Sequence, residues 1–422
     1  MIQKLKKNPL IKVLSINSIS VAVSFVLGVF SSKIISVFLG TSGMALTGSF
    51  RNFTAMLKSI ATLGVSNSVV KLFVENKENK EELGTIYSTF FGFFLILSSL
   101  LGISVVLFAS QISQFIFFKN AYYIPIQFFG LALPMIVINV FWTAIYNAFE
   151  KFKLIVIIQI SSNILLFAIT ALLIWKENLF GGLLAIAIGD LISFGITYFF
   201  IKKSFGYFKF SIKKMTVGKY FTVLKRFSLM AFLSAVIVPV TLILIRNKIV
   251  ALYTTQEAGI WDGVNRLSSF YMMFFNAGLS LYYVPKLASL KTDKEFKNEL
   301  KEYFKILVPL FLIMLMFIFI LKDFIIELAF TKEFHRIKSI LVWQMLGDFF
   351  RIMSLAFGFQ IVIKSMMKRY FIIEIVFNAT FLILSFLLLP QYSSQGVIQA
   401  YCIASILSFL IMIFMFRKLF RN

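Results

Sequence analysis

Twelve apolar stretches alternate with short polar segments along the chain. Most are about 20 residues or longer, enough to cross ~30 Å of hydrocarbon as an α-helix, and none shows the short alternation of a membrane β-barrel strand. The pattern therefore predicts a polytopic α-helical membrane protein. The predicted spans are residues 11–39, 42–73, 84–110, 124–149, 154–175, 182–201, 227–247, 258–285, 306–321, 339–363, 370–389 and 396–416.

Residues of the same type recur at a constant offset of 215 along almost the whole chain. Apolar matches mean little in a chain with 53 Phe residues, but polar matches at one unbroken offset indicate duplication of a six-span unit. The pairs include Lys33 with Lys248, Gly48 with Gly263, Arg51 with Arg266, Lys71 with Lys286, Lys153 with Lys368, Gln159 with Glu374, Asn163 with Asn378, Gly181 with Gly396, Ser193 with Ser408 and Lys203 with Lys418.

The predicted fold class is an all-α integral membrane protein of twelve transmembrane helices in two six-helix lobes around a central cavity. A half with an even number of spans places its copy in the same orientation, so the lobes are expected to be parallel repeats related by about 180° about the membrane normal. The predicted domains are an N-terminal lobe (1–203), a basic cytoplasmic linker (204–226) and a C-terminal lobe (227–422).

Composition supports the membrane class, and charge adds an orientation. The chain is 59% hydrophobic with a mean hydropathy of +0.90, well above the ~45–50% apolar content of soluble domains. A net charge of +24 would suggest nucleic acid in a soluble protein, but here 27 of the 42 Lys and Arg residues lie in the segments on one side of the predicted spans. By the positive-inside rule, both termini are predicted to be cytoplasmic, and no nucleic-acid partner is expected.

Several kinds of chemistry find no support in the sequence. Cys402 and His335 are the single residues of their types, so neither a disulfide nor a Cys/His metal site is predicted. No phosphate-binding glycine-rich loop occurs, and we expect no cofactor. The segment Met1–Leu10 runs into a long span without a small-residue cleavage site, so the first helix is expected to be retained. Any transport would use an ion gradient, the membrane potential or the substrate's own gradient.

Eight cations fall within the predicted spans. A cation at the centre of a membrane helix costs about 2.5–3.5 kcal/mol, so each one asks for an explanation. Those near span ends, Lys12, Lys71 and Arg246, are expected to extend to the headgroups. At 1.5 Å per residue, Arg51 and Arg266 lie roughly 12–14 Å below the outer ends of their helices, and Lys58 and Arg351 lie deeper. The eighth, Lys33, is expected near the periplasmic side.

The deep cations share helix faces with small residues. Gly48, Arg51 and Lys58 follow one face of the second span, and Gly263 and Arg266 repeat it on the eighth. Because the duplication makes these spans equivalent, Arg51 and Arg266 are expected to face each other across the interface between the lobes. The resulting cavity would carry excess positive charge and favour an anionic substrate group. The predicted substrate-binding residues are Lys33, Arg51, Lys58, Arg266 and Arg351, and the predicted coupling acids are Asp262, Asp348 and Glu374.

Structural roles for the same residues stay open. Asp262 with Arg266, and Asp348 with Arg351, have the spacing of intrahelical ion pairs that would neutralise each other. Four polar residues within spans, Asn163, Asn378, Ser193 and Ser408, favour hydrogen bonds between helices over ligand contacts. The segment Lys202 to Arg226 alternates cations with aromatic residues, which is typical of a linker on the cytoplasmic leaflet.

Four segments carry a family resemblance: FLGTSGMALTGSFRNF around Arg51, MAFLSAVIVPVTLILIRNKI before Val250, EAGIWDGVNRLSSFY around Arg266, and VWQMLGDFFRI around Arg351. They resemble the Wzx-type flippases, the O-antigen and enterobacterial common antigen translocases of the multidrug/oligosaccharidyl-lipid/polysaccharide exporter superfamily. The chain is richer in Phe and Lys than is usual for that family. The resemblance implies two six-helix lobes that open alternately to the cytoplasm and periplasm of a bacterial inner membrane.

The implied function is transport without catalysis. The implied cargo is an undecaprenyl-pyrophosphate-linked oligosaccharide, an O-antigen or enterobacterial common antigen unit, which moves from the cytoplasmic to the periplasmic leaflet. The implied partners are this lipid, the surrounding membrane lipids, a glycan polymerase and a chain-length regulator. A pyrophosphate is a dense anion that guanidinium groups bind through charge-assisted hydrogen bonds, which agrees with the cationic residues.

Other functions make different demands on the sequence. A multidrug or cation antiporter of the same superfamily predicts a cavity dominated by acids. A membrane glycosyltransferase or glycan polymerase predicts a large external loop with catalytic carboxylates or arginines, whereas the longest predicted external loop, 322–338, has only Asp323, Glu327 and Glu333 as acids. A scaffold that transports nothing is also compatible with the sequence.

Overall fold

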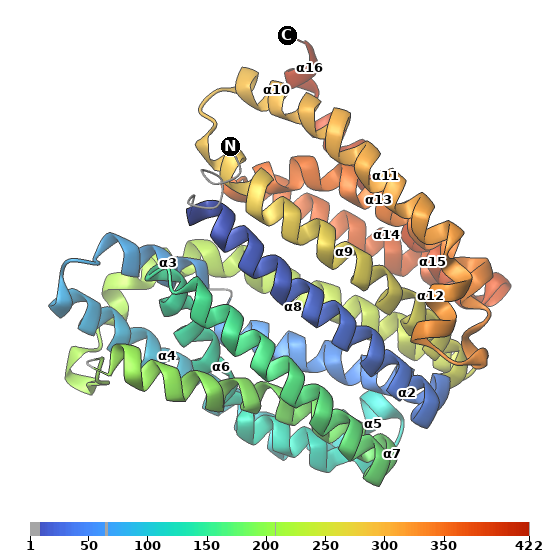
Figure 1. The fold of residues 1–422 in the computed structure, drawn as a ribbon, viewed down its shortest axis with the longest axis horizontal. Helices are drawn as coiled ribbons and strands as arrows, with labels where there is room; N and C mark the ends of the chain where they lie inside the picture. The colour runs from blue at the N-terminus through green and yellow to red at the C-terminus, as the bar shows by residue number, and fades with distance from the viewer. Residues whose placement is uncertain (1–8, 64–65, 207, 422) are drawn as a thin grey trace. The chain divides into compact units, whose positions relative to one another are not determined.

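Helices form all the regular structure that the computed structural model describes, which covers residues 9–63, 66–206 and 208–421 (Figure 1). The first half of the chain forms α2 (Pro9–Thr62), α3 (Ser66–Glu75), α4 (Lys80–Leu107), α5 (Ala109–Phe117), the short η1 (Asn120–Tyr122), α6 (Tyr123–Ala148) and α7 (Phe152–Phe205). The all-α prediction is confirmed.

The second half follows a short connection. The elements are η2 (Ile212–Lys214), α8 (Val217–Leu252), α9 (Thr255–Ser289), α10 (Asp293–Glu302), the π-helical turn η3 (Tyr303–Leu307), α11 (Val308–Ile320), α12 (Lys322–Ala329), η4 (Lys332–Phe334), α13 (Ile337–Ile363), α14 (Met367–Tyr392), α15 (Ser394–Met415) and α16 (Arg417–Arg421). Two helix boundaries differ from the predicted spans. α2 ends at Thr62, whereas the second span was predicted to reach residue 73, and α8 begins at Val217, before the span predicted at 227–247.

Nine helical segments of the described chain are long and apolar enough to cross a membrane. Two of them, Ser18–Thr62 and Phe152–Phe205, contain 45 and 54 residues, about twice what ~30 Å of hydrocarbon requires. Each is broken by one residue with positive φ, Gly40 (φ 62°) or Asn178 (φ 48°), and is therefore two spans joined at a kink. Together with α9, whose charged residues lower its hydropathy, the described helices account for the twelve predicted spans.

The backbone itself repeats at the offset of 215. Asn178 and Ser393 both have positive φ, 48° and 56°, and so do Glu150 and Ser365, 56° and 52°. Non-glycine residues rarely adopt this conformation, so two such pairs at one spacing are informative. The helices that follow also keep the spacing, since α7 begins at Phe152 and α14 at Met367. The structure therefore confirms that the two halves share one helical plan.

Contacts group the chain into two compact units. The first comprises Met1–Leu27 and Ser49–Pro239, and the second comprises Gly28–Gly48 and Val240–Asn422. The middle of α2 thus belongs to the unit that contains the C-terminal half of the chain. The sequence-based lobes, 1–203 and 227–422, assign that segment to the N-terminal half and stay a prediction.

In the first unit, α6 packs against both α4 and α7. The segment after α7 is fixed to α4: the Ser211 amide donates to Ser88 Oγ at 3.2 Å, and the Thr216 amide donates to Thr89 Oγ1 at 3.0 Å. Phe208 stacks on Tyr87 with 5.2 Å between ring centroids. The connection is therefore a docked part of this unit, whose lysines at 209, 213 and 214 stay exposed.

In the second unit, α13, α14 and α15 lie side by side, and α9 packs against α13 (Figure 1). The middle of α2 joins them through its kink. At Gly40 an added Cβ would lie 2.9 Å from Glu333 Oε2, and the Thr41 amide donates to that oxygen at 3.3 Å. A carboxylate at the start of a helix segment is favoured by the helix dipole. A Cβ at Gly259 would lie 1.9 Å from the Thr41 carbonyl oxygen. The backbones of α2 and α9 are therefore in close contact at this glycine.

A carboxylate fixes the start of α9, the helix that carries Asp262 and Arg266. Glu257 accepts hydrogen bonds from the hydroxyl of Ser393 and, at 3.0 Å, from the amide of Ser394, and pairs with Arg336 at 2.6 Å. Burial alone would raise the pKa of Glu257, but the hydrogen bonds from both serines and the charge of Arg336 lower it below the usual value. The ionised carboxylate therefore ties α9 to the first residues of α13 and α15.

Candidate functional site

Lys33, a predicted substrate-binding residue, contacts a helix end. Its ammonium donates to the carbonyl oxygens of Glu327 at 2.7 Å and Phe330 at 2.6 Å, at the C-terminus of α12. The last carbonyls of a helix have no partners within the helix and carry partial negative charge. The contacts of Lys33 are those of a helix-capping residue.

Lys58, which has no acidic partner on its own helix, finds one on α7 of the first unit. Its ammonium lies 2.8 Å from Asp190 Oδ2, and about a third of each side chain stays exposed. Sequence spacing does not reveal this pair, because 132 residues separate its members. The pair neutralises both charges while leaving one edge accessible.

Arg246 was expected to reach the headgroups, and that prediction was wrong. The side chain is only 2% exposed, and its Nε and Nη2 donate to the two carboxylate oxygens of Asp262 at 2.8 and 2.5 Å. Trp261 covers the guanidinium at 5.4 Å, and Gly48 leaves room for the carboxylate, since a Cβ there would lie 2.9 Å from it. A bidentate pair of this kind is strongly oriented.

The two arginines paired by the repeat lie in different units. Arg51 is on α2 in the first unit and Arg266 is on α9 in the second, and both side chains are half-buried. Arg266 Nη1 lies 4.0 Å from the sulfur of Met44. Both residues keep exposed surface on which an anionic ligand can be held.

Asp348 lies in a buried polar cluster formed by α9, α13 and α15. The carboxylate is 1% exposed and accepts hydrogen bonds from four side chains. Ser268 and Tyr271 donate to Oδ2, and Gln344 and Tyr401 donate to Oδ1 at 3.2 and 2.8 Å. Four donors satisfy the oxygens of this buried carboxyl group without a cation. Asp348 therefore fixes the packing of these three helices.

The sequence reasoning found Asp348 but missed the residues around it. At the offset of 215 the first half has apolar residues at all five positions, namely Phe53, Met56, Phe129, Leu133 and Ile186. A position that is polar in one half and apolar at the equivalent place in the other half is a signal in the sequence. It would have identified Ser268, Tyr271, Gln344 and Tyr401 as a cluster.

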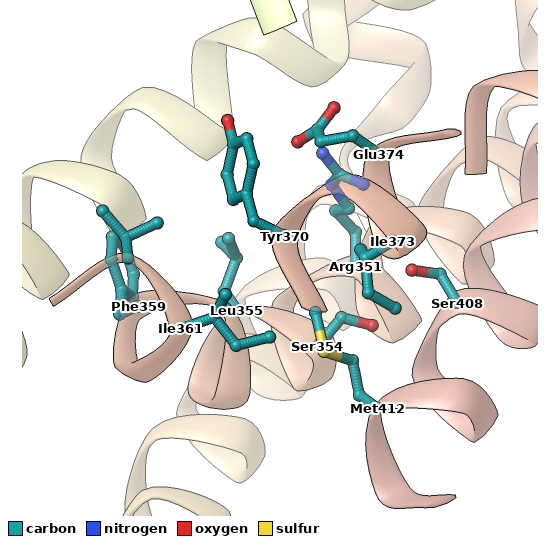
Figure 2. Close-up of a pocket in the computed structure, with 12 residues that line it drawn as sticks. Arg351, Ser354, Leu355, Phe359, Ile361, Tyr370, Ile373, Glu374, Ser408 and Met412 are labelled. Carbon is teal, nitrogen blue, oxygen red and sulfur yellow. The ribbon is translucent and has the colours of Figure 1, made fainter. Parts of the chain in front are cut away.

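Arg351 and Glu374 are the two predicted site residues that the structure brings into one cavity. The cavity, of about 230 Å³, lies between α13, α14 and α15 of the second unit, and Ser354, Tyr370 and Ser408 also line it. Figure 2 shows the guanidinium of Arg351 and the carboxylate of Glu374 extending toward the same side of the cavity. The ring of Phe377 lies 4.5 Å from the guanidinium carbon. This arrangement offers a small ligand one cation, one acid and several hydroxyl groups.

Hydrogen bonds between helices, predicted for four polar residues, form for two of them. Asn163 donates to Ser24 Oγ at 2.8 Å, and Ser193 accepts from Asn139 at 3.0 Å. Their repeat partners differ. Asn378 donates to the carbonyl of Glu374 on its own helix, and Ser408 Oγ, although buried, has no hydrogen-bond partner among the described residues.

The fold and the charged residues together define a multi-pass α-helical membrane protein. The family model for polysaccharide biosynthesis proteins matches residues 10–291, and the chain belongs to that family. The lipid III flippases of Escherichia coli (strain K12) and Shigella flexneri are each 26% identical to it over 389 residues, which is 90% of this chain and 92% of theirs.

Solved structures show the same fold at lower identity. The lipid II flippase MurJ in an inward closed conformation matches with a TM-score of 0.77 and 19% identity, covering 95% of this chain and 87% of that one. An inward-facing MATE family multidrug transporter of the MOP superfamily matches with a TM-score of 0.76 and 13% identity over 94% of this chain and 96% of that one. These likenesses place the chain in the fold of membrane transporters.

The Asp348 cluster predicts a stability effect. Asp348→Asn should lower the free energy of unfolding by ~2–3 kcal/mol, because the new amide NH₂ group would face hydroxyl and amide donors. The measurement is the thermal unfolding temperature of the detergent-purified protein. Asp323→Asn is the matched control, since the Asp323 side chain is 63% exposed and only its surface pair with Lys338 would be lost. Equal unfolding temperatures for both variants would contradict this account.

Proposed function

We propose that this protein is a flippase for an undecaprenyl-pyrophosphate-linked oligosaccharide, an O-antigen or enterobacterial common antigen unit. The observation that carries the proposal is the set of cations retained in the membrane-spanning helices, above all Arg51 and Arg266. Membership of the polysaccharide biosynthesis family and the similarity to lipid III flippases support it. The protein would act as a transporter, without catalysing a reaction.

Arg51 and Arg266 would bind the pyrophosphate. Guanidinium groups form bidentate, charge-assisted hydrogen bonds with phosphate oxygens and replace part of the water that the anion loses. The direct contacts are assigned to the arginines because a guanidinium can bind two phosphate oxygens at once. Lys33 donates to the end of α12, and Lys58, which pairs with Asp190, would contribute through its exposed edge. The lipid tail would stay in hydrocarbon while the headgroup crosses.

Transport would proceed by alternating access in the bacterial inner membrane, with both termini cytoplasmic. The excess of Lys and Arg on one side of the spans supports this orientation. The saccharide would move from the cytoplasmic to the periplasmic leaflet, where a glycan polymerase and a chain-length regulator are the proposed partners.

Energy coupling is assigned to the membrane carboxylates Asp262, Asp348 and Glu374. A carboxylate near arginines can exchange partners when a substrate leaves, and its protonation can bias which partner it has. Asp262 sits between Arg246, which it contacts, and Arg266, one helical turn away on α9. Glu374 lines a cavity and so has room for such an exchange, whereas Asp348 is enclosed by its four donors.

Replacing both arginines tests the binding role. The variant with Arg51→Ala and Arg266→Ala should lose most surface glycan in a flippase-deficient strain, because each lost charged hydrogen bond costs about 1.5–3 kcal/mol. Lys214→Ala is the control, since Lys214 is exposed on the first unit. Normal surface glycan from a well-expressed double variant would refute the assignment.

A second experiment tests the coupling acids. Asp262→Asn and Glu374→Gln should each reduce transport about tenfold or more if protonation of these groups drives a conformational change. Transport should also fall when an ionophore collapses the proton gradient. If every single Asn or Gln variant, Asp348→Asn included, transports normally and the ionophore has no effect, proton coupling through these residues is wrong.

A further inference from the structure

The cavity between α13, α14 and α15 contains two polar groups that the fold leaves unsatisfied. Within the described chain, Arg351 makes no hydrogen bond or ion pair, and the face of Phe377 is its stabilising contact. Ser408 is 2% exposed, and its hydroxyl finds no partner there either. An unpaired buried donor and a cation deep in a membrane span are both costly, so a ligand that accepts hydrogen bonds from both groups would stabilise them.

The equivalent positions in the first half of the chain carry no charge and take part in two hydrogen bonds between helices. There the counterparts of Arg351, Ser354, Glu374 and Ser408 are Ile136, Asn139, Gln159 and Ser193. Asn139 donates to Ser193, and Ser20 donates to Gln159, each at 3.0 Å. Where the first half has these two neutral hydrogen-bonded pairs, the second half has an arginine and an acid that line a cavity.

The chemistry of the lining favours an anion. A guanidinium and a serine hydroxyl both donate hydrogen bonds, and Figure 2 shows that Ser408 directs its hydroxyl toward the side of the cavity where Arg351 lies. Lys364 lies in the turn that joins α13 to α14, and Lys368 and Arg369 lie in the first turn of α14. At 1.5 Å per residue, Arg351 lies ~18 Å before the end of α13 and Glu374 ~10 Å after the start of α14, so this turn is at the shallow end of the cavity.

We propose that this cavity binds a phosphate or pyrophosphate group, with Arg351 and Ser408 donating hydrogen bonds to its oxygens. The cavity volume of about 230 Å³ is many times the ~10–15 Å³ that one water requires, so a group of several oxygen atoms has room there. The inference rests on the proposed function for the source of the group, the lipid-linked substrate. It adds a second phosphate site, which lies within one unit. This site would open toward the side of the membrane that is predicted to be cytoplasmic.

Glu374 would regulate this site. Its carboxylate shares the cavity with Arg351, and an ionised acid disfavours a bound anion by repulsion. Removing that charge should therefore tighten phosphate binding. The first half already has the uncharged residue, Gln159, at the equivalent position.

The experiment measures binding of inorganic pyrophosphate to the full-length protein in nanodiscs by isothermal titration calorimetry. The background carries Arg51→Gln and Arg266→Gln, so that the proposed transport site does not contribute. Adding Arg351→Gln should weaken the remaining binding by about tenfold or more, and Ser408→Ala by several-fold. Glu374→Gln should tighten it. Arg417→Gln is the matched control. The guanidinium carbon of Arg417 lies 4.5 Å from the ring of Phe414, as that of Arg351 lies 4.5 Å from the ring of Phe377, but Arg417 is exposed and lines no part of the cavity.

The outcomes are separable. A background protein that binds no pyrophosphate, or an Arg351→Gln effect no larger than that of Arg417→Gln, overturns the site and leaves the flippase assignment standing. Polyprenyl pyrophosphate in the nanodisc should compete with inorganic pyrophosphate, which supports the lipid substrate as the source. If it does not compete, the assignment to the substrate is overturned. Ser408→Ala and Glu374→Gln keep the test decisive if Arg351→Gln fails to fold.

Discussion

The cost of holding a charge in hydrocarbon explains more of this structure than any other constraint. Arg246 lowers this cost by pairing with the carboxylate of Asp262 and packing against the ring of Trp261. Lys58 lowers it by pairing with Asp190 on a neighbouring helix. Lys33 lowers it by donating hydrogen bonds to carbonyl oxygens at the C-terminus of α12. These partners lie within one unit and stabilise the helices, although Nη1 of Arg246 has no hydrogen-bond partner among the described residues. Arg351 has no such solution among the described residues, and that difference separates structural cations from candidate binding residues.

The duplication provides a scaffold in which added charge is easy to identify. Helix starts and positive-φ turns recur at 215 residues, so corresponding positions can be compared directly. The second half carries Asp348 with its four donors and the Arg351–Glu374 cavity where the first half has apolar or hydrogen-bonded residues. Two halves with one backbone plan thus differ in the charged and polar residues that they carry.

The sequence predicted the spans well because hydrophobic length depends on the bilayer, which is the same for every helix. It predicted the duplication because Lys, Arg and Asn rarely match by chance. It could not predict that Asp262 pairs with Arg246, since the spacing favoured Arg266, or that Lys58 pairs with Asp190 across 132 residues. Such pairs depend on how helices pack, which periodicity does not specify. The placement of Gly28–Gly48 in the second unit was unforeseen for the same reason, because it results from contacts of Gly40, Thr41 and Gly48.

The central claim is that the membrane cations carry a lipid-linked pyrophosphate across the bilayer. The most direct measurement reconstitutes the purified protein in liposomes that contain a fluorescent polyprenyl-pyrophosphate oligosaccharide, and follows its accessibility to a membrane-impermeant glycosidase. The account predicts that substrate in the inner leaflet becomes accessible with the active protein and stays protected with the Arg51→Ala, Arg266→Ala variant. Inner-leaflet substrate that stays protected with correctly folded protein that retains Arg51 and Arg266 would contradict the account.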